Sequence, residues 1–146
     1  MKLYLDTSVF SAYYDGRTPE RMQMTRNFWQ ILDQHKKLCS ELTVEELNRA
    51  RSNLRQKLVE LTENFTILAI TDQMRTLAED YVEERVVPSR YFSDALHIAA
   101  AVLGDADILV SWNFQHLVKR STRLLVNYVS AKHGFRTIEI LAPPEA

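Results

Sequence analysis

Four polar residues of this sequence have the types and positions to bind a divalent metal ion. Asp6 and Asn113 each come just after a short apolar run, and Glu46 and Asp94 each lie in the first turn of a segment with helical periodicity. Mg²⁺ and Mn²⁺ prefer oxygen donors of these kinds. Crowded carboxylates repel one another, and a bound cation removes that repulsion. Such a site could activate water and stabilise the charge on a phosphodiester during cleavage, with one metal ion or with two.

Short apolar runs alternate with helical patterns along the 146 residues. We expect strands at residues 3–5, 37–40, 65–68, 108–110 and 137–140. Helical segments are expected at 19–36, from 43 onward with a bend near 52, from 71 to before 88, at 93–104 and at 122–132. This order predicts an α/β fold with a mainly parallel five-stranded sheet covered by helices on both faces.

The connections of a parallel sheet decide which polar residues meet. Right-handed crossovers bring every strand's carboxyl end to one edge, where ligands of open α/β sheets bind. Asp94 opens the second of two helices expected between the third and fourth strands, and the first of them descends roughly 20 Å from that edge. The extended residues 86–92 can climb back over roughly 23 Å. We therefore expect Asp94 to reach Asp6.

Four segments carry a resemblance to a known family. Residues 5–9, 42–47, 93–99 and 108–113 resemble, in this order, the acid-bearing motifs of PIN-domain nucleases, particularly the toxin ribonucleases of VapBC toxin–antitoxin systems. The resemblance implies a three-layer α/β/α sandwich that spans residues 1–146 as a single PIN-like domain. It also implies hydrolysis of RNA by an Mg²⁺- or Mn²⁺-dependent endoribonuclease, an antitoxin protein as partner, and a homodimer.

In this resemblance Asp6, Glu46 and Asp94 are the metal ligands, and together with Asn113 they form the catalytic set. The family commonly has an aspartate at the fourth position, and asparagine brings a carbonyl oxygen without a charge. This difference motivates an alternative function, a catalytically weak PIN-like module that binds RNA or a protein. A haloacid-dehalogenase type of phosphatase is disfavoured, because Asp6 is not part of an Asp-x-Asp motif.

Each acidic position also has a purely structural interpretation. Asp6 or Asn113 could cap the segment that follows it, and Asp94 would be favoured near a helix N-terminus by the helix dipole.

Glu46 could form a capping box with Thr43, which leaves the neighbouring Glu45 as the alternative ligand. Thr7 and Ser8 could bind substrate or metal-bound water, or act only as caps.

The histidines do not favour a zinc site, because zinc ligands usually cluster more tightly. His97 lies among apolar residues and is expected to be a hydrogen-bonded core residue, whereas His116 is a candidate substrate-binding residue. Asp105 and Asp107 are expected to make turns at the opposite edge of the sheet. Two basic groups could contact RNA or form solvated helix faces: Arg49, Arg51 and Arg55, and Lys119, Arg120 and Arg123.

Composition adds few constraints. The net charge of −1 neither indicates nor excludes a nucleic-acid partner. The one cysteine, Cys39, rules out an internal disulfide and is expected in a buried strand. No apolar run approaches the roughly 20 residues of a membrane span, and the start Met-Lys-Leu-Tyr-Leu-Asp reaches the charge of Asp6 too soon for a signal peptide. We therefore expect no membrane partner and a cytoplasmic location.

Overall fold

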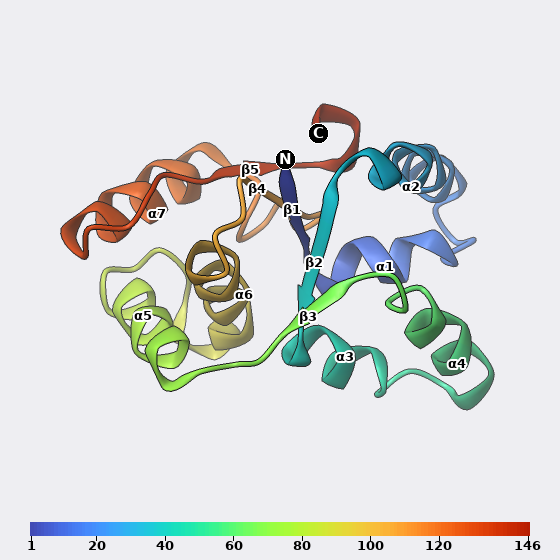
Figure 1. Ribbon diagram of the computed structural model, residues 1–146, viewed down its shortest axis with the longest axis horizontal. Coiled ribbons are helices and arrows are strands. Elements are labelled where there is room, and N and C mark those ends of the chain that lie inside the picture. The colour runs from blue at the N-terminus through green and yellow to red at the C-terminus, as the bar shows by residue number, and fades with distance from the viewer.

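The computed structural model describes residues 1–146 and is organised around one five-stranded sheet in the order β3-β2-β1-β4-β5 (Figure 1). All four strand pairings are parallel. The strands are β1 (Lys2–Leu5), β2 (Lys36–Ser40), β3 (Thr66–Leu68), β4 (Ile108–Val110) and β5 (Glu139–Leu141). The predicted parallel α/β sheet is confirmed, and each strand lies within two residues of its expected position.

Helices cover both faces of the sheet and complete the α/β/α sandwich (Figure 1). One side carries α1 (Thr7–Tyr13), α2 (Pro19–Ile31) and α4 (Ser52–Glu60), with α3 (Glu41–Leu47) beside α1 and α4 at the end of β2. The other side carries α5 (Asp72–Glu83), α6 (Phe92–Leu103) and α7 (Arg120–Lys132). Three short 3₁₀ turns complete the chain: η1 (Leu32–Gln34), η2 (Ser89–Tyr91) and η3 (Pro143–Glu145).

The central elements, β1 and α6, are buried on all sides. Leu3, Tyr4 and Leu5 of β1 are almost fully buried, as expected for a strand with helices above and below. Every residue of α6 from Ala95 to Ala101 is also buried, because α6 packs against both the sheet and α5. No helix is long and apolar enough to cross a membrane.

Three helical expectations need correction. The short helix α1 directly after Asp6 was not among the expected segments. The helix expected at 19–36 ends at Ile31 and is followed by the 3₁₀ turn η1, because the chain enters β2 at Lys36, whose N–H donates to the Met1 carbonyl at 2.9 Å. The segment from 43 onward is two helices, and the first begins earlier, at Glu41. Strand pairing has overridden local helix propensity here.

The amino edge of the sheet holds the residues expected to make turns. Asp107 accepts a hydrogen bond from the Lys2 backbone N–H at 2.8 Å, and Asp105 adopts a left-handed φ of 63°. Both therefore lie opposite the predicted site, as expected. Cys39 is a buried, unpaired residue of β2, which is also as predicted.

The end of α6 generates a stability prediction. A Cβ added at Gly104 would lie 2.7 Å from the Ala100 carbonyl oxygen and 2.4 Å from Leu68 Cδ1, whereas a Cβ at Gly16 would meet no atom within 4 Å. Gly104→Ala should therefore lower the free energy of unfolding by about 1–3 kcal/mol. The control Gly16→Ala should change it by less than about 0.5 kcal/mol. Chemical denaturation measures both, and equal effects would contradict the packing at Gly104.

Candidate active site

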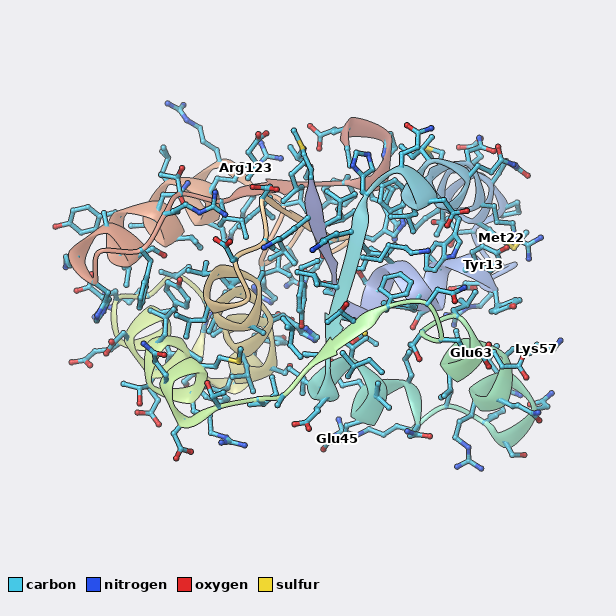
Figure 2. The ribbon with its side chains drawn as sticks, in the orientation of Figure 1. Tyr13, Met22, Glu45, Lys57, Glu63 and Arg123 are labelled. Atoms are coloured by element: carbon cyan, nitrogen blue, oxygen red, sulfur yellow. The ribbon has the colours of Figure 1, made fainter.

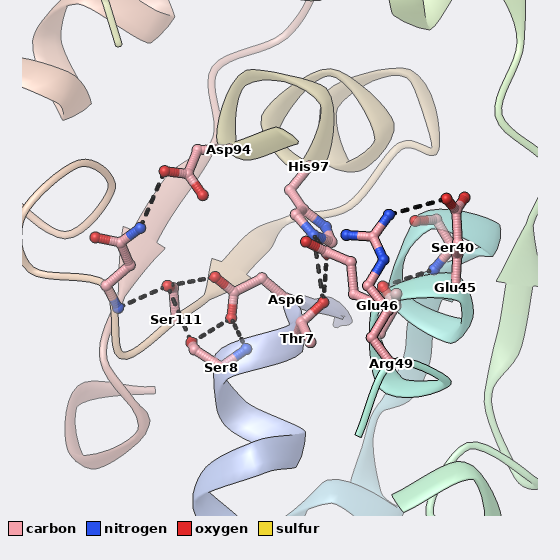
Figure 3. Close-up of polar contacts among 12 residues, drawn as sticks. Asp6, Thr7, Ser8, Ser40, Glu45, Glu46, Arg49, Asp94, His97 and Ser111 are labelled. Atoms are coloured by element: carbon pink, nitrogen blue, oxygen red, sulfur yellow. Dashed lines mark hydrogen bonds and ion pairs between the residues drawn. The ribbon is translucent and has the colours of Figure 1, made fainter. Parts of the chain in front are cut away.

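Asp6 lies where β1 ends, at the point where the strand order reverses between β1 and β4. The register pairs Leu5 with Val110, so the next residues, Asp6 and Ser111, lie side by side. Asp6 Oδ2 accepts a hydrogen bond from Ser111 Oγ at 2.6 Å, and Oδ1 accepts from Ser8 Oγ at 2.5 Å and from the Ser8 backbone N–H at 3.1 Å (Figure 3). Asp6 therefore caps α1, as one interpretation expected, and is also held at the carboxyl edge where open α/β sheets bind ligands.

Glu46 points inward from α3 toward the same edge. Its Oε1 accepts hydrogen bonds from Thr7 Oγ1 at 2.7 Å and from His97 Nε2 at 2.6 Å (Figure 3). Glu45 instead projects away from the protein (Figure 2) and pairs with Arg49 at 3.1 Å. Glu46, rather than Glu45, is thus the residue of this segment that faces the site.

The capping box proposed for Glu46 is wrong. Helix α3 begins two residues before Thr43, and Thr43 Oγ1 itself accepts from the Ser40 backbone N–H at 3.3 Å. The Glu46 carboxylate is therefore not needed at the helix N-terminus.

His97 is the buried, hydrogen-bonded core histidine that the sequence predicted, and it also anchors the site. Its Nδ1 lies 2.8 Å from the Tyr4 hydroxyl, which lies 2.8 Å from Ser40 Oγ. Burial raises the pKa of Tyr4 far above its ordinary value, so the phenol keeps its proton and can donate to Nδ1. This tautomer leaves the Nε2 proton for Glu46.

Asp94 and Asn113 form the other side of the site. Asn113 Nδ2 donates to Asp94 Oδ2 at 3.2 Å, and Asn113 Oδ1 accepts from the His116 backbone N–H at 2.9 Å. The Asn113 backbone N–H also donates to Ser111 Oγ at 2.9 Å, which links this pair to Asp6. The amide carbonyl of Asn113 is therefore occupied by the following turn, and its NH₂ group faces the neighbouring carboxylate.

The three acids differ in their electrostatic surroundings. Burial raises the pKa of Asp6. Burial, followed by the negative charge of Asp6, raises the pKa of Asp94. Burial also acts to raise the pKa of Glu46, but the hydrogen bonds from His97 Nε2 and from the Thr7 hydroxyl lower it below the ordinary value. Glu46 is thus stabilised as a carboxylate, whereas Asp6 and Asp94 disfavour each other's ionisation.

The chemistry of these donors fits a hard divalent cation. The buried carboxylate of Asp6 and the half-buried carboxylate of Asp94 would both be stabilised by a cation, and Mg²⁺ takes one or two protein carboxylates while it keeps several waters. No three His, Cys, Asp or Glu side chains converge as a ready-made ligand set. The residues therefore suit a hydrated ion rather than a closed, all-protein metal cage.

A cavity of about 190 Å³ opens beside Asp6 and Asn113. Its lining includes Ser8, Asn113 and Arg21. The Arg21 guanidinium lies 4.9 Å from the centre of the Trp112 ring, a cation–π distance. Asp15 also lines the cavity, so it offers a polar approach to the acids with one cationic and one anionic side chain in its wall.

The fold brings most of the predicted residues together, although some have different contacts from those expected. Thr7 and Ser8 hold carboxylates, and His116 lies one turn beyond Asn113. Among the basic residues, Arg49 pairs with Glu45, and Arg123 Nε donates to the Ile140 carbonyl at 3.0 Å.

Sequence reasoning missed the roles of Ser111, Tyr4 and Arg21. Only Ser111 had a usable signal, because it directly follows β4 as Asp6 directly follows β1.

Comparisons with known proteins identify the family and the fold. The sequence profile of the PIN domain matches residues 3–114. No curated protein sequence matches the chain.

Solved structures share the fold at low sequence identity. VapC20 of Mycobacterium tuberculosis, described as a sarcin–ricin loop cleaving toxin, has 14% identity and a TM-score of 0.62, over 93% of this chain and 98% of that one. VapBC-1 of nontypeable Haemophilus influenzae has 14% identity and a TM-score of 0.62, over 99% of each chain. VapBC2 of Rickettsia felis, bound to a promoter DNA fragment, has 11% identity and a TM-score of 0.61, over 97% and 98%. Since the profile covers most of the sequence and the sheet order and helices agree with it, the chain belongs to the PIN-domain family.

Proposed function

We propose that this protein is a divalent-metal-dependent endoribonuclease, with Asp6, Glu46, Asp94 and Asn113 as its catalytic set. The observation that carries the proposal is the buried carboxylate of Asp6 at the carboxyl edge of the sheet, with the half-buried carboxylate of Asp94 near enough for the charge of Asp6 to raise its pKa. Capping of α1 accounts for Asp6, but not for a second carboxylate placed where the two charges repel, and a cation would stabilise both. The neighbouring polar cavity provides an approach for a phosphodiester.

In this proposal the protein's residues prepare the site before substrate arrives. Asp6 and Asp94, with Glu46 beside them, would hold Mg²⁺ or Mn²⁺, which supplies an activated water and stabilises charge on the phosphate when bound. Ser8 and Ser111 fix both oxygens of Asp6. Preorganised groups of this kind need little rearrangement during the reaction.

On the Glu46 side, His97 and Thr7 keep the carboxylate ionised and oriented. The cavity beside Arg21 would admit the RNA backbone, and the hydroxyl groups at its wall would contact phosphate or metal-bound water.

The biological setting is proposed from family membership and from the solved structures. Residues 1–146 would act as one PIN-like domain, the toxin of a type II toxin–antitoxin pair, with an antitoxin protein and a second copy as partners in the cytoplasm. The support is the likeness to VapC20 and to chains of VapBC complexes, together with one sheet and one buried core cluster.

A second candidate function is a catalytically weak module that binds RNA or protein. Two observations favour it: Asn113 occupies the fourth position, and no three metal-ligating side chains converge. Absence of both Mn²⁺ binding and metal-dependent cleavage would select this function.

Asp94→Asn should abolish RNA cleavage in Mn²⁺ or Mg²⁺, with a loss of at least roughly a hundredfold, because a charge beside the phosphate is removed. Asp72→Asn is the matched control, since Asp72 also lies in a helix's first turn but is fully exposed and pairs only with Arg75. Cleavage of structured and single-stranded RNA with and without EDTA measures the effect. Equal activity of the two variants would remove Asp94 from the catalytic set.

The same substitution should stabilise the metal-free protein at neutral pH. A carboxyl group whose pKa is raised by folding binds more protons in the folded state, so its ionisation lowers stability as pH rises through that raised pKa. Asp94→Asn should therefore raise the melting temperature in EDTA, and the gain should shrink toward the ordinary acid range. Added Mn²⁺ should stabilise wild type more than the variant. A lower melting temperature for the variant at neutral pH would contradict the raised pKa.

Asn113→Asp should shift stability in the opposite direction. A fourth carboxylate would replace the amide that donates to Asp94, so the melting temperature in EDTA should fall. Mn²⁺ should then stabilise the variant more than it stabilises wild type, because the extra charge strengthens cation binding. A loss of Mn²⁺-induced stabilisation would show that this side chain does not face the metal position.

A further inference from the structure

A second cavity, of about 530 Å³, lies on the side of the 113–116 turn away from Asn113. Its polar lining consists of Arg85, Ser89, Gln115, His116, Lys119 and Ser121, and no acidic residue contributes to it. Apolar residues of the α5–η2 connection and of α7 form the rest of the wall. The cavity is therefore basic, although it adjoins an acidic site.

His116 lines this cavity, and one polar atom of its ring has no hydrogen-bond partner. The side chain is 8% exposed, and its Nε2 atom is buried with no hydrogen-bond partner. The ring stacks on Tyr91 with a centroid distance of 4.1 Å, so its orientation is fixed. Buried polar side-chain atoms almost always have a partner. The Nε2 atom of His116 therefore lacks a hydrogen-bond partner, and a ligand could provide one.

The two cations of the cavity are also unpaired. Neither Arg85 nor Lys119 takes part in any of the ion pairs or side-chain hydrogen bonds of the structure, whereas Lys132 and Arg136 on the same side of the molecule pair with acids at 2.9 and 2.6 Å. Lys119 is also the N-cap of the 13-residue helix α7, so the free N–H groups of the first turn, including that of Ser121, lie at this cavity. Helix N-termini of this kind favour anions.

We propose that this cavity binds a backbone phosphate of the RNA strand that lies across the acidic site. The proposal rests on the proposed nuclease function for the identity of the strand, and it adds a phosphate-binding site to one side of the acids. His116 and Asn113 connect the two sites, because the His116 N–H is the donor that occupies the Asn113 carbonyl. The phosphate would accept from His116, Arg85 and Lys119 and from the amides of α7.

The location argues for a strand rather than an isolated small anion. A phosphodiester at Asp6 and Asp94 is flanked by further phosphates of the same strand, and these need cationic contacts that the acids themselves cannot provide. The basic cavity adjoins the acids through one turn of chain. The surface is thus acidic at the metal position and basic beside it. A strand with one phosphate at the metal position requires this change, because its neighbouring phosphates need cationic contacts.

The salt dependence of RNA binding tests the site without cleavage. A labelled single-stranded RNA of mixed sequence is titrated in EDTA with wild type, with Arg85→Gln/Lys119→Gln, and with the control Lys36→Gln at the amino edge of β2. The double variant should lower the slope of log affinity against log salt by about 0.7 per lost phosphate contact. It should also weaken binding roughly tenfold at about 0.1 M salt. Lys36→Gln should match wild type. Unchanged slope and affinity in the double variant would overturn the proposal.

Nuclear magnetic resonance with inorganic phosphate as the probe gives a second measurement. Millimolar phosphate should shift the His116 ring and α7 first-turn signals of wild type, and the double variant should lose these shifts. Tight saturation by phosphate, together with an unchanged salt slope for RNA, would assign the cavity to a small phosphate ligand and refute the strand proposal. If wild type cleaves no RNA while the double variant still lowers the salt slope, the nuclease function is refuted and the phosphate site remains supported.

Discussion

Asp6 and Asp94 are carboxylates removed from most of the water that would stabilise their charges, and each raises the cost of ionising the other. Much of the local structure can be understood from this constraint. Ser8 and Ser111 supply hydroxyl donors to Asp6, and Asn113 supplies an amide donor to Asp94. These neutral donors reduce the repulsion without neutralising it. The two carboxylates therefore still repel each other, and a bound divalent cation would remove that repulsion.

The topology of the sheet brings the residues of this site together. Residues that are 105 positions apart in the chain, Asp6 and Ser111, become neighbours because β1 and β4 pair in the middle of the sheet. The strand order reverses between these two strands, so the connections lead away from the junction and leave it accessible. Glu46 and His97 then approach from helices on opposite sides of the sheet. A buried chain of contacts through Tyr4 and Ser40 ties this arrangement to β1 and β2.

Asparagine at position 113 changes the balance of this site in a defined way. Its amide donates to Asp94, while its carbonyl closes the turn to His116. An aspartate could close the same turn but would add a negative charge. The chain thus has a less acidic site than the family commonly has, with a basic cavity at its border. We interpret the combination as suited to a phosphate-bearing strand, since weaker repulsion and nearby cations both favour anions.

The sequence by itself determined the strand order, the parallel sheet and most of the helices, although not α1 or the division into α3 and α4. It also indicated the edge of the sheet at which Asp6, Glu46 and Asp94 lie. These follow from periodicity and from crossover handedness, which are properties of local sequence and chain connectivity. Only the tertiary structure decided the contacts within that edge. Register placed Ser111 against Asp6, and pairing with β1 ended α2 early.

The start of α3 at Glu41 turned Glu46 toward His97. The unpaired cations and the buried nitrogen of His116 were likewise invisible in the sequence. Whether a charged side chain finds a partner depends on distances between residues that no spacing along the chain specifies.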